Sequence, residues 1–145
     1  ESVHVTATSF VEDDGDPIHL LDPSKDTWWM SGNNNSSASI VFEFLQSTFE
    51  VDGVILYSRG RSFPRNIRIS VSNDKSNWAV LYNQEEPLKF KEGDFVFKFH
   101  LSPESKFIQI EAGKETFHND TVHFAQIASV EFFGWLYPAQ NLSRG

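Results

Sequence analysis

Hydrophobic and polar residues alternate along much of this chain, and a period of two is typical of β-strands that bury one face. In residues 67–72, three branched aliphatic residues alternate with one arginine and two serines. In residues 95–100, three phenylalanines alternate with Val96, Lys98 and His100. Helical periodicity is almost absent. The pattern therefore predicts sheets that are apolar on one side only.

Eight candidate strands follow from this pattern and from the turn residues between them. They are residues 3–10, 39–45, 49–58, 66–72, 78–82, 94–101, 106–111 and 125–133. Gly, Asn, Asp and Pro separate them, as at residues 14–17 and 32–35, and these residue types dominate turns. About eight strands with no long helix between them predict an all-β fold, an antiparallel jelly-roll β-sandwich.

One domain accounts for the chain. A domain of 145 residues buries roughly 68–70% of its unfolded surface, and 14 Phe and 4 Trp supply a core. We predict that the β-sandwich spans residues 1–135. Residues 136–145 are predicted to form a tail or linker, because Pro138 and the polar run after it do not continue the strand pattern.

Charge and cysteine content exclude several classes of function. The net charge of −8 argues against nucleic acid as a partner, because phosphate contacts need clustered basic residues. It also disfavours an anionic membrane surface. The absence of cysteine excludes disulfides, thiolate zinc sites and cysteine catalysis. The sequence does not assign a compartment.

Three segments carry motifs in a fixed order. Residues 22–31 (DPSKDTWWMS), 69–78 (ISVSNDKSNW) and 127–134 (IASVEFFG) form a turn, a hairpin and a closing strand. They resemble the Asp-Gly-Asn-x-x-Thr-x-Trp, Ser-x-Asp-Gly-x-x-Trp and Ile/Glu-Phe-x-Gly segments of discoidin, or coagulation factor V/VIII C-type, domains. The resemblance covers nearly the whole chain. It implies a jelly-roll sandwich that is similar to the family 32 carbohydrate-binding modules.

The resemblance also implies a structural calcium ion at the first turn. Calcium takes about six to eight oxygen ligands. Asp22 and Asp26 would supply carboxylates, and Thr27 a hydroxyl and a carbonyl oxygen. Glu131 would add a carboxylate from the last strand. The alternative is that Asp22 caps a turn started by Pro23, while Asp26 and Glu131 face water.

The resemblance further implies a ligand site in the loops at one end of the sandwich. The predicted contacts are Trp28, Arg59, Arg61, Phe117 and His118. A sugar packs its apolar face on an aromatic ring, while charged donors bind its hydroxyl groups. Neighbouring residues of an extended chain point to opposite sides, so we expect Trp29 in the core and Trp28 near the surface. For each arginine the alternative is a solvated loop residue.

No catalytic pattern emerges from the five histidines and many acids: a nucleophile elbow, a phosphate-binding Gly loop and His-Glu-x-x-His are all absent from the sequence. We therefore predict a non-catalytic module that binds a glycan or glycoprotein. Met30 stands where sugar-binding relatives often have His, which argues against galactose specificity. The alternative is a protein-interaction or scaffolding module of a larger eukaryotic protein. Phosphatidylserine binding is disfavoured by the net charge.

Overall fold

The computed structural model describes residues 2–24, 26–32, 37–84, 87–91, 93–113, 115–118 and 124–138. Its elements are β1 (Val3–Ala7), the 3-10 helix η1 (Pro17–Leu21), β2 (Trp29–Met30), β3 (Ala38–Phe44), β4 (Ser47–Tyr57), β5 (Ile67–Ser72), β6 (Ala79–Asn83), β7 (Asp94–Lys98), β8 (Phe107–Ala112), β9 (Gln126–Ile127) and β10 (Ser129–Pro138). Within the described residues no α-helix occurs, and no helix has the length and apolar character to cross a membrane.

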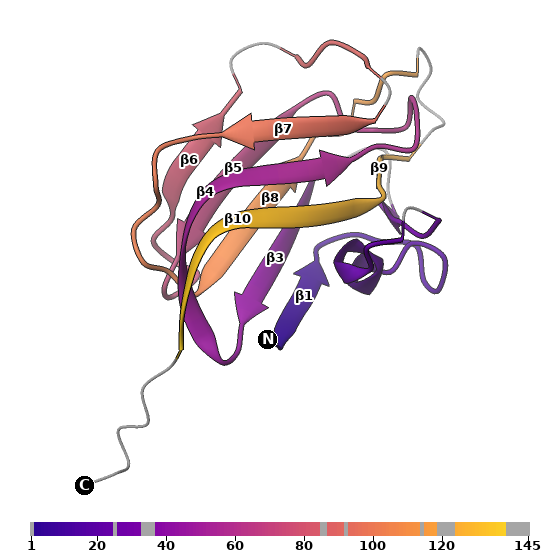
Figure 1. Cartoon of the computed structure of the whole chain (residues 1–145). Helices are drawn as coiled ribbons and strands as arrows, with labels where there is room; N and C mark the ends of the chain where they lie inside the picture. Colours follow the sequence, from indigo (N-terminus) through magenta and orange to yellow (C-terminus); the bar gives the residue numbers. More distant parts are fainter. Residues whose placement is uncertain are drawn as a thin grey trace, which may run out of the picture.

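The strands form two facing sheets and one short pair. The larger sheet has the order β1-β3-β8-β5-β6, the smaller one the order β10-β4-β7, and β2 pairs with β9. Figure 1 shows the smaller sheet in front of the larger one. All seven strand pairs in these sheets are antiparallel. The predicted all-β antiparallel sandwich is therefore confirmed.

Aromatic contacts between the two sheets build the core. Phe42 of β3 and Phe132 of β10 meet edge to face, with ring centroids 5.0 Å apart. Tyr82 of β6 meets Phe97 of β7 in the same way at 4.9 Å. Because β7 alternates, Phe97 is buried, whereas Val96 on the outer face is 50% exposed. The period of two thus places the phenylalanines of β7 between the sheets.

The larger sheet departs from the predicted one-sided burial at β5. This strand lies between β8 and β6, and its residues Ser70 and Ser72 are buried although the pattern placed them on a polar face. The Ser72 hydroxyl donates to Asp74 Oδ1 at 3.0 Å and accepts from the backbone of the following turn. Satisfied hydrogen bonds make such burial tolerable.

Several strand ends differ from the prediction. The first strand ends at Ala7, and the last predicted strand divides into β9 and β10. Strand β10 continues to Pro138, three residues beyond residue 135, because its end pairs with residues 47–49 of β4. The predicted boundary at residue 135 therefore falls inside β10, and residues 139–145 of the predicted tail lie outside the described residues. The short helix η1 and strand β2 were not predicted, since two to five residues carry too little periodicity.

Candidate functional site

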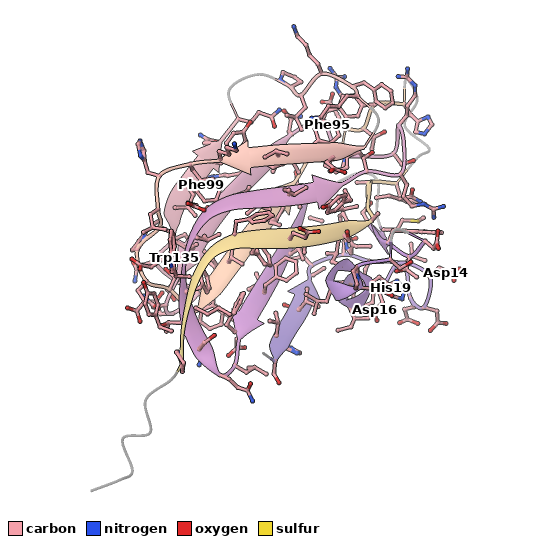
Figure 2. All side chains as sticks on the ribbon, viewed as in Figure 1. Asp14, Asp16, His19, Phe95, Phe99 and Trp135 are labelled. Carbon is pink, nitrogen blue, oxygen red and sulfur yellow. The ribbon has the colours of Figure 1, made fainter. Side chains whose placement is uncertain are left out.

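Loops from separate parts of the chain meet at one end of the sandwich. They contain residues 26–28, 58–66, 87–91 and 115–118, which we call the loop end. The Arg65 amide donates to the Glu115 carbonyl at 2.9 Å, and the Leu88 amide donates to the Arg65 carbonyl at 2.9 Å. Figure 1 shows that β4 ends and β7 begins here, and Figure 2 labels Phe95 at this end and Trp135 at the opposite end.

Strand β2 places Trp28 beside the loop that follows β4. Trp29 pairs with Ile127 in β9, and the next residue, Ala128, donates its amide to the Tyr57 carbonyl at 2.8 Å. The His19 ring on η1, labelled in Figure 2, donates through Nδ1 to the Trp28 carbonyl at 2.9 Å. The start of β2 is therefore held by β9 through strand pairing and by η1 through the His19 hydrogen bond.

The two adjacent tryptophans have different environments, as expected. Trp29 is 0% exposed, and its Nε1 donates to the Ser9 carbonyl at 3.0 Å. Trp28 is half-buried, and the Arg59 guanidinium carbon lies 4.1 Å from its ring centroid. Arg59 itself is exposed. The structure thus brings two predicted contact residues, Trp28 and Arg59, into a cation–π pair.

A second cation–π pair involves a residue that the sequence did not single out. The Arg61 guanidinium carbon lies 4.1 Å from the ring centroid of Phe90, which precedes β7. Phe90 in turn meets Phe117 edge to face at 5.3 Å. Phe90 stands between two lysines in a polar run, Lys89 and Lys91, and an isolated aromatic in such a run is the signal that could have identified it.

Phe117 and His118 are less open than an exposed loop would make them. Both are half-buried, and the Phe117 ring lies 6.1 Å from Phe95 in a stacked orientation. The His118 amide donates to Thr116 Oγ1 at 3.2 Å. The rest of this predicted loop, residues 119–123, lies outside the described residues. The Phe117 ring therefore contacts Phe90 in the loop end on one side and Phe95 in the core on the other.

The predicted calcium ligands come from two parts of the chain: three precede β2, and the fourth, Glu131, lies on β10. Asp22 and Asp26 are exposed, and Asp22 Oδ1 accepts from the Ser24 amide at 2.9 Å. Thr27 Oγ1 is buried and has no hydrogen-bond partner among the described residues. Among the described residues no group of three or more His, Cys, Asp or Glu side chains could hold a metal ion. The structure does not gather the three acids, yet it leaves the threonine hydroxyl unsatisfied.

Glu131 has a partner of its own on β10. Its Oε1 accepts a hydrogen bond from the Tyr57 hydroxyl at 2.8 Å. This hydrogen bond, together with burial and the nearby negative charges, raises the pKa of Tyr57 to about 12. One oxygen of the Glu131 carboxylate is therefore engaged within the protein.

The family comparison identifies one domain type over most of the chain. The F5/8 type C domain pattern matches residues 4–128. These residues include every element of the loop end. No curated protein is a significant match to the chain.

Solved structures share the fold at low sequence identity. CpGH89CBM32-5 from Clostridium perfringens, in complex with GalNAc-β-1,3-galactose, is 19% identical, with a TM-score of 0.75 over 91% of this chain and 95% of that one. Chitosan-binding module 1 of a Paenibacillus chitosanase/glucanase is 20% identical, with a TM-score of 0.71 over 90% and 94%. A pectin-binding carbohydrate-binding module is 18% identical, with a TM-score of 0.72 over 91% and 90%. At these identities the likeness shows the fold.

Proposed function

This chain belongs to the F5/8 type C domain family, and from that premise we propose that it is a non-catalytic module whose loop end binds carbohydrate. The observation that carries the proposal is the pair of Trp28 and exposed Arg59, whose ring and guanidinium lie 4.1 Å apart. The guanidinium over the ring supplies charged donors for sugar hydroxyl groups, and the edge of the indole ring supplies an apolar contact.

Each predicted contact residue has a separate role in this proposal. Arg59 and Arg61 donate to sugar oxygens, and the edge of Trp28 contacts the apolar face of a sugar ring. Phe117 supports the site through Phe90, and the His118 ring supplies a further polar group. The glycans named for three similar structures, GalNAc-β-1,3-galactose, chitosan and pectin, support a carbohydrate as the ligand.

A glycan-array screen with calcium present tests the proposal. We expect the wild-type chain to give a reproducible hit that Arg59→Ala loses. The matched control is Arg68→Ala, because Arg68 is an exposed arginine on β5, outside the loop end. Since Arg59 is exposed, its loss should leave the melting temperature nearly unchanged. A blank array from demonstrably folded wild-type protein would reject carbohydrate binding.

We further propose a structural calcium ion at the first turn, held by Asp22, Asp26 and Thr27 and joined by the second carboxylate oxygen of Glu131 when the ion draws the acids together. The Thr27 hydroxyl is buried and finds no partner in the described part of the chain, which supports the proposal, since buried polar groups normally have a partner. Exposed carboxylates on the same turn match the oxygen ligands that calcium prefers.

Calcium should therefore raise the melting temperature relative to a chelator. A ligand at 100 times its Kd adds about 2.7 kcal/mol to the free energy of unfolding. For a chain of this size that corresponds to a rise of about 5–10 °C. Thr27→Val keeps the shape of the side chain, lacks the hydroxyl and should lose most of this rise. Superimposable melting curves of the wild type in calcium and in chelator would refute the site.

A second candidate function, protein interaction, is favoured by the exposed end of β10. This strand lies at the edge of its sheet, and its exposed side chains include Phe133 (45%), Trp135 (56%) and Leu136 (53%). Trp135 also lines a largely apolar cavity of about 320 Å³. Contiguous exposed apolar residues mark protein interaction sites. Trp135 lies at the end of the sandwich opposite the loop end (Figure 2).

A further inference from the structure

Two arginines of one loop are each held against an aromatic ring. The guanidinium carbons of Arg59 and Arg61 lie 4.1 Å from the ring centroids of Trp28 and Phe90, respectively. Gly60 lies between the two arginines, and its φ of +139° is one that other residues rarely adopt. A guanidinium that contacts a ring through its flat face keeps its in-plane N–H groups available for another partner.

Neither of these arginines has a carboxylate partner among the described residues. The ion pairs found there are Arg65–Glu115 at 3.9 Å and Lys106–Glu43 at 3.8 Å. Arg59 and Arg61 are both exposed, in a chain that has 20 acidic and only 12 basic residues. Acidic side chains outnumber them in the sequence, yet none in the described part of the chain neutralises the two guanidinium groups.

A third cation belongs to the same group of rings. Lys91 Nζ lies 5.2 Å from the ring centroid of Phe95, which stacks on Phe63 at 4.3 Å. The nearby carboxylates of Asp94 and Glu131 act on Tyr57, on the outer face of the smaller sheet. Three cations of the loop end, Arg59, Arg61 and Lys91, thus lie against aromatic rings.

This arrangement favours an acidic ligand over a neutral one. The face of Trp28 under Arg59 is covered by the guanidinium, so a neutral sugar cannot stack on that face unless the arginine moves. A carboxylate or sulfate can instead accept two N–H hydrogen bonds from a guanidinium that the ring already holds in position. Such charge-assisted hydrogen bonds are about twice as strong as neutral ones. We infer that the loop end takes glycans that carry acidic groups, carboxylates or sulfate esters, and that Arg59 and Arg61 bind those groups.

This inference rests on the proposed carbohydrate function and makes its ligand class specific. The net charge of −8 argues against an extended anionic surface such as a membrane. A short acidic glycan meets mainly the charges close to it, because at physiological ionic strength charges more than about 8 Å away are largely screened. Binding is then governed by the charges nearest the ligand. For the same reason, the affinity should fall as salt is added.

Calorimetric titration with matched pairs of glycans tests the inference. The first pair is an oligogalacturonate and its methyl ester, which differ in charge but share the same sugars. The second pair is a sulfated galactan oligosaccharide and its desulfated form. We expect at least one acidic member to bind about tenfold or more tightly than its neutral partner, and its affinity to fall between about 50 and 300 mM salt.

Variants locate the effect at the two arginines. Arg59→Gln and Arg61→Gln should each reduce the affinity for the acidic glycan about tenfold, and the double variant should abolish the preference. Arg59→Lys should retain part of it, because the charge remains but the paired donors are lost. Arg68→Gln, on β5, is the control that should change nothing.

Three outcomes would overturn the inference. Equal affinity for acidic and neutral members of both pairs would reject the acidic ligand class and leave carbohydrate binding intact. A preference that survives in the double variant would place the anion elsewhere. If no glycan binds the folded wild type, the proposed function fails as well. Binding to phosphatidylserine vesicles in that case would show that the two arginines bind lipid phosphate instead.

Discussion

Trp29→Ala is expected to lower the free energy of unfolding by about 3–5 kcal/mol, as large-to-small changes of buried aromatics do. The Trp29 side chain is 0% exposed, so truncation leaves a cavity between β2 and the sheets. It also leaves the Ser9 carbonyl without the indole N–H that donates to it at 3.0 Å. Urea unfolding at neutral pH, followed by circular dichroism, measures the loss.

Trp28→Ala provides the matched control one residue away. Trp28 is half-buried and contacts Arg59, and its indole N–H has no partner within the described residues. We expect its truncation to cost only about 1–2 kcal/mol, typical of a single substitution outside the core, and to weaken glycan binding. Equal losses of stability in the two variants would contradict the separate roles assigned to Trp28 and Trp29.

Gly134→Ala is expected to destabilise the chain by about 4 kcal/mol or more, which is at the upper end for single substitutions. Gly134 has a φ of +154°, and a Cβ at this position would lie 2.0 Å from the Glu50 carbonyl oxygen and 2.8 Å from Val51 Cα. Both atoms are backbone atoms of the paired strand β4, so relief requires the strands to separate. The register of β10 against β4 also shifts between Phe133 and Gly134.

Gly60→Ala separates backbone strain from this collision. Gly60 also has a positive φ, of +139°, but a Cβ added there would meet no atom of the described residues within 4 Å. Its substitution should cost about 1–3 kcal/mol from strain alone. Denaturant unfolding of both variants gives the comparison. If Gly134→Ala lowers the free energy of unfolding no more than Gly60→Ala does, the close packing of β10 on β4 is not the reason that residue 134 must be glycine.

The period of two was sufficient to predict the sandwich, because successive side chains of a strand point to opposite faces and only one face of each sheet packs in the core. It predicted that Phe95 and Phe97 would point inward, and both are buried. It failed where burial depends on neighbours that are distant in sequence. Ser70 is buried whereas Arg68 on the same strand is exposed, and the alternation of β5 does not distinguish the two. Residues 136–138 extend β10 because β4 offers them backbone partners.

The site was less accessible to sequence reasoning, because its contacts join separate loops. The motifs of the chain indicated Trp28 and Arg59 as contact residues, but nothing in their spacing shows that one stacks on the other. Phe90 is part of the site because its ring contacts Arg61 and Phe117, which are far from it in the sequence. Contacts of this kind follow from the topology that brings the loops together.

Chemical-shift mapping tests the central claim most directly. The wild-type chain, labelled with nitrogen-15, is titrated with a glycan identified on the array, and its backbone amide shifts are followed. We predict that the largest changes fall at the loop end, in residues 26–28, 58–66, 87–91 and 115–118, and that Trp135 and its neighbours on β10 stay unchanged. Changes confined to β10, or no changes at saturating glycan, would contradict carbohydrate binding at the loop end.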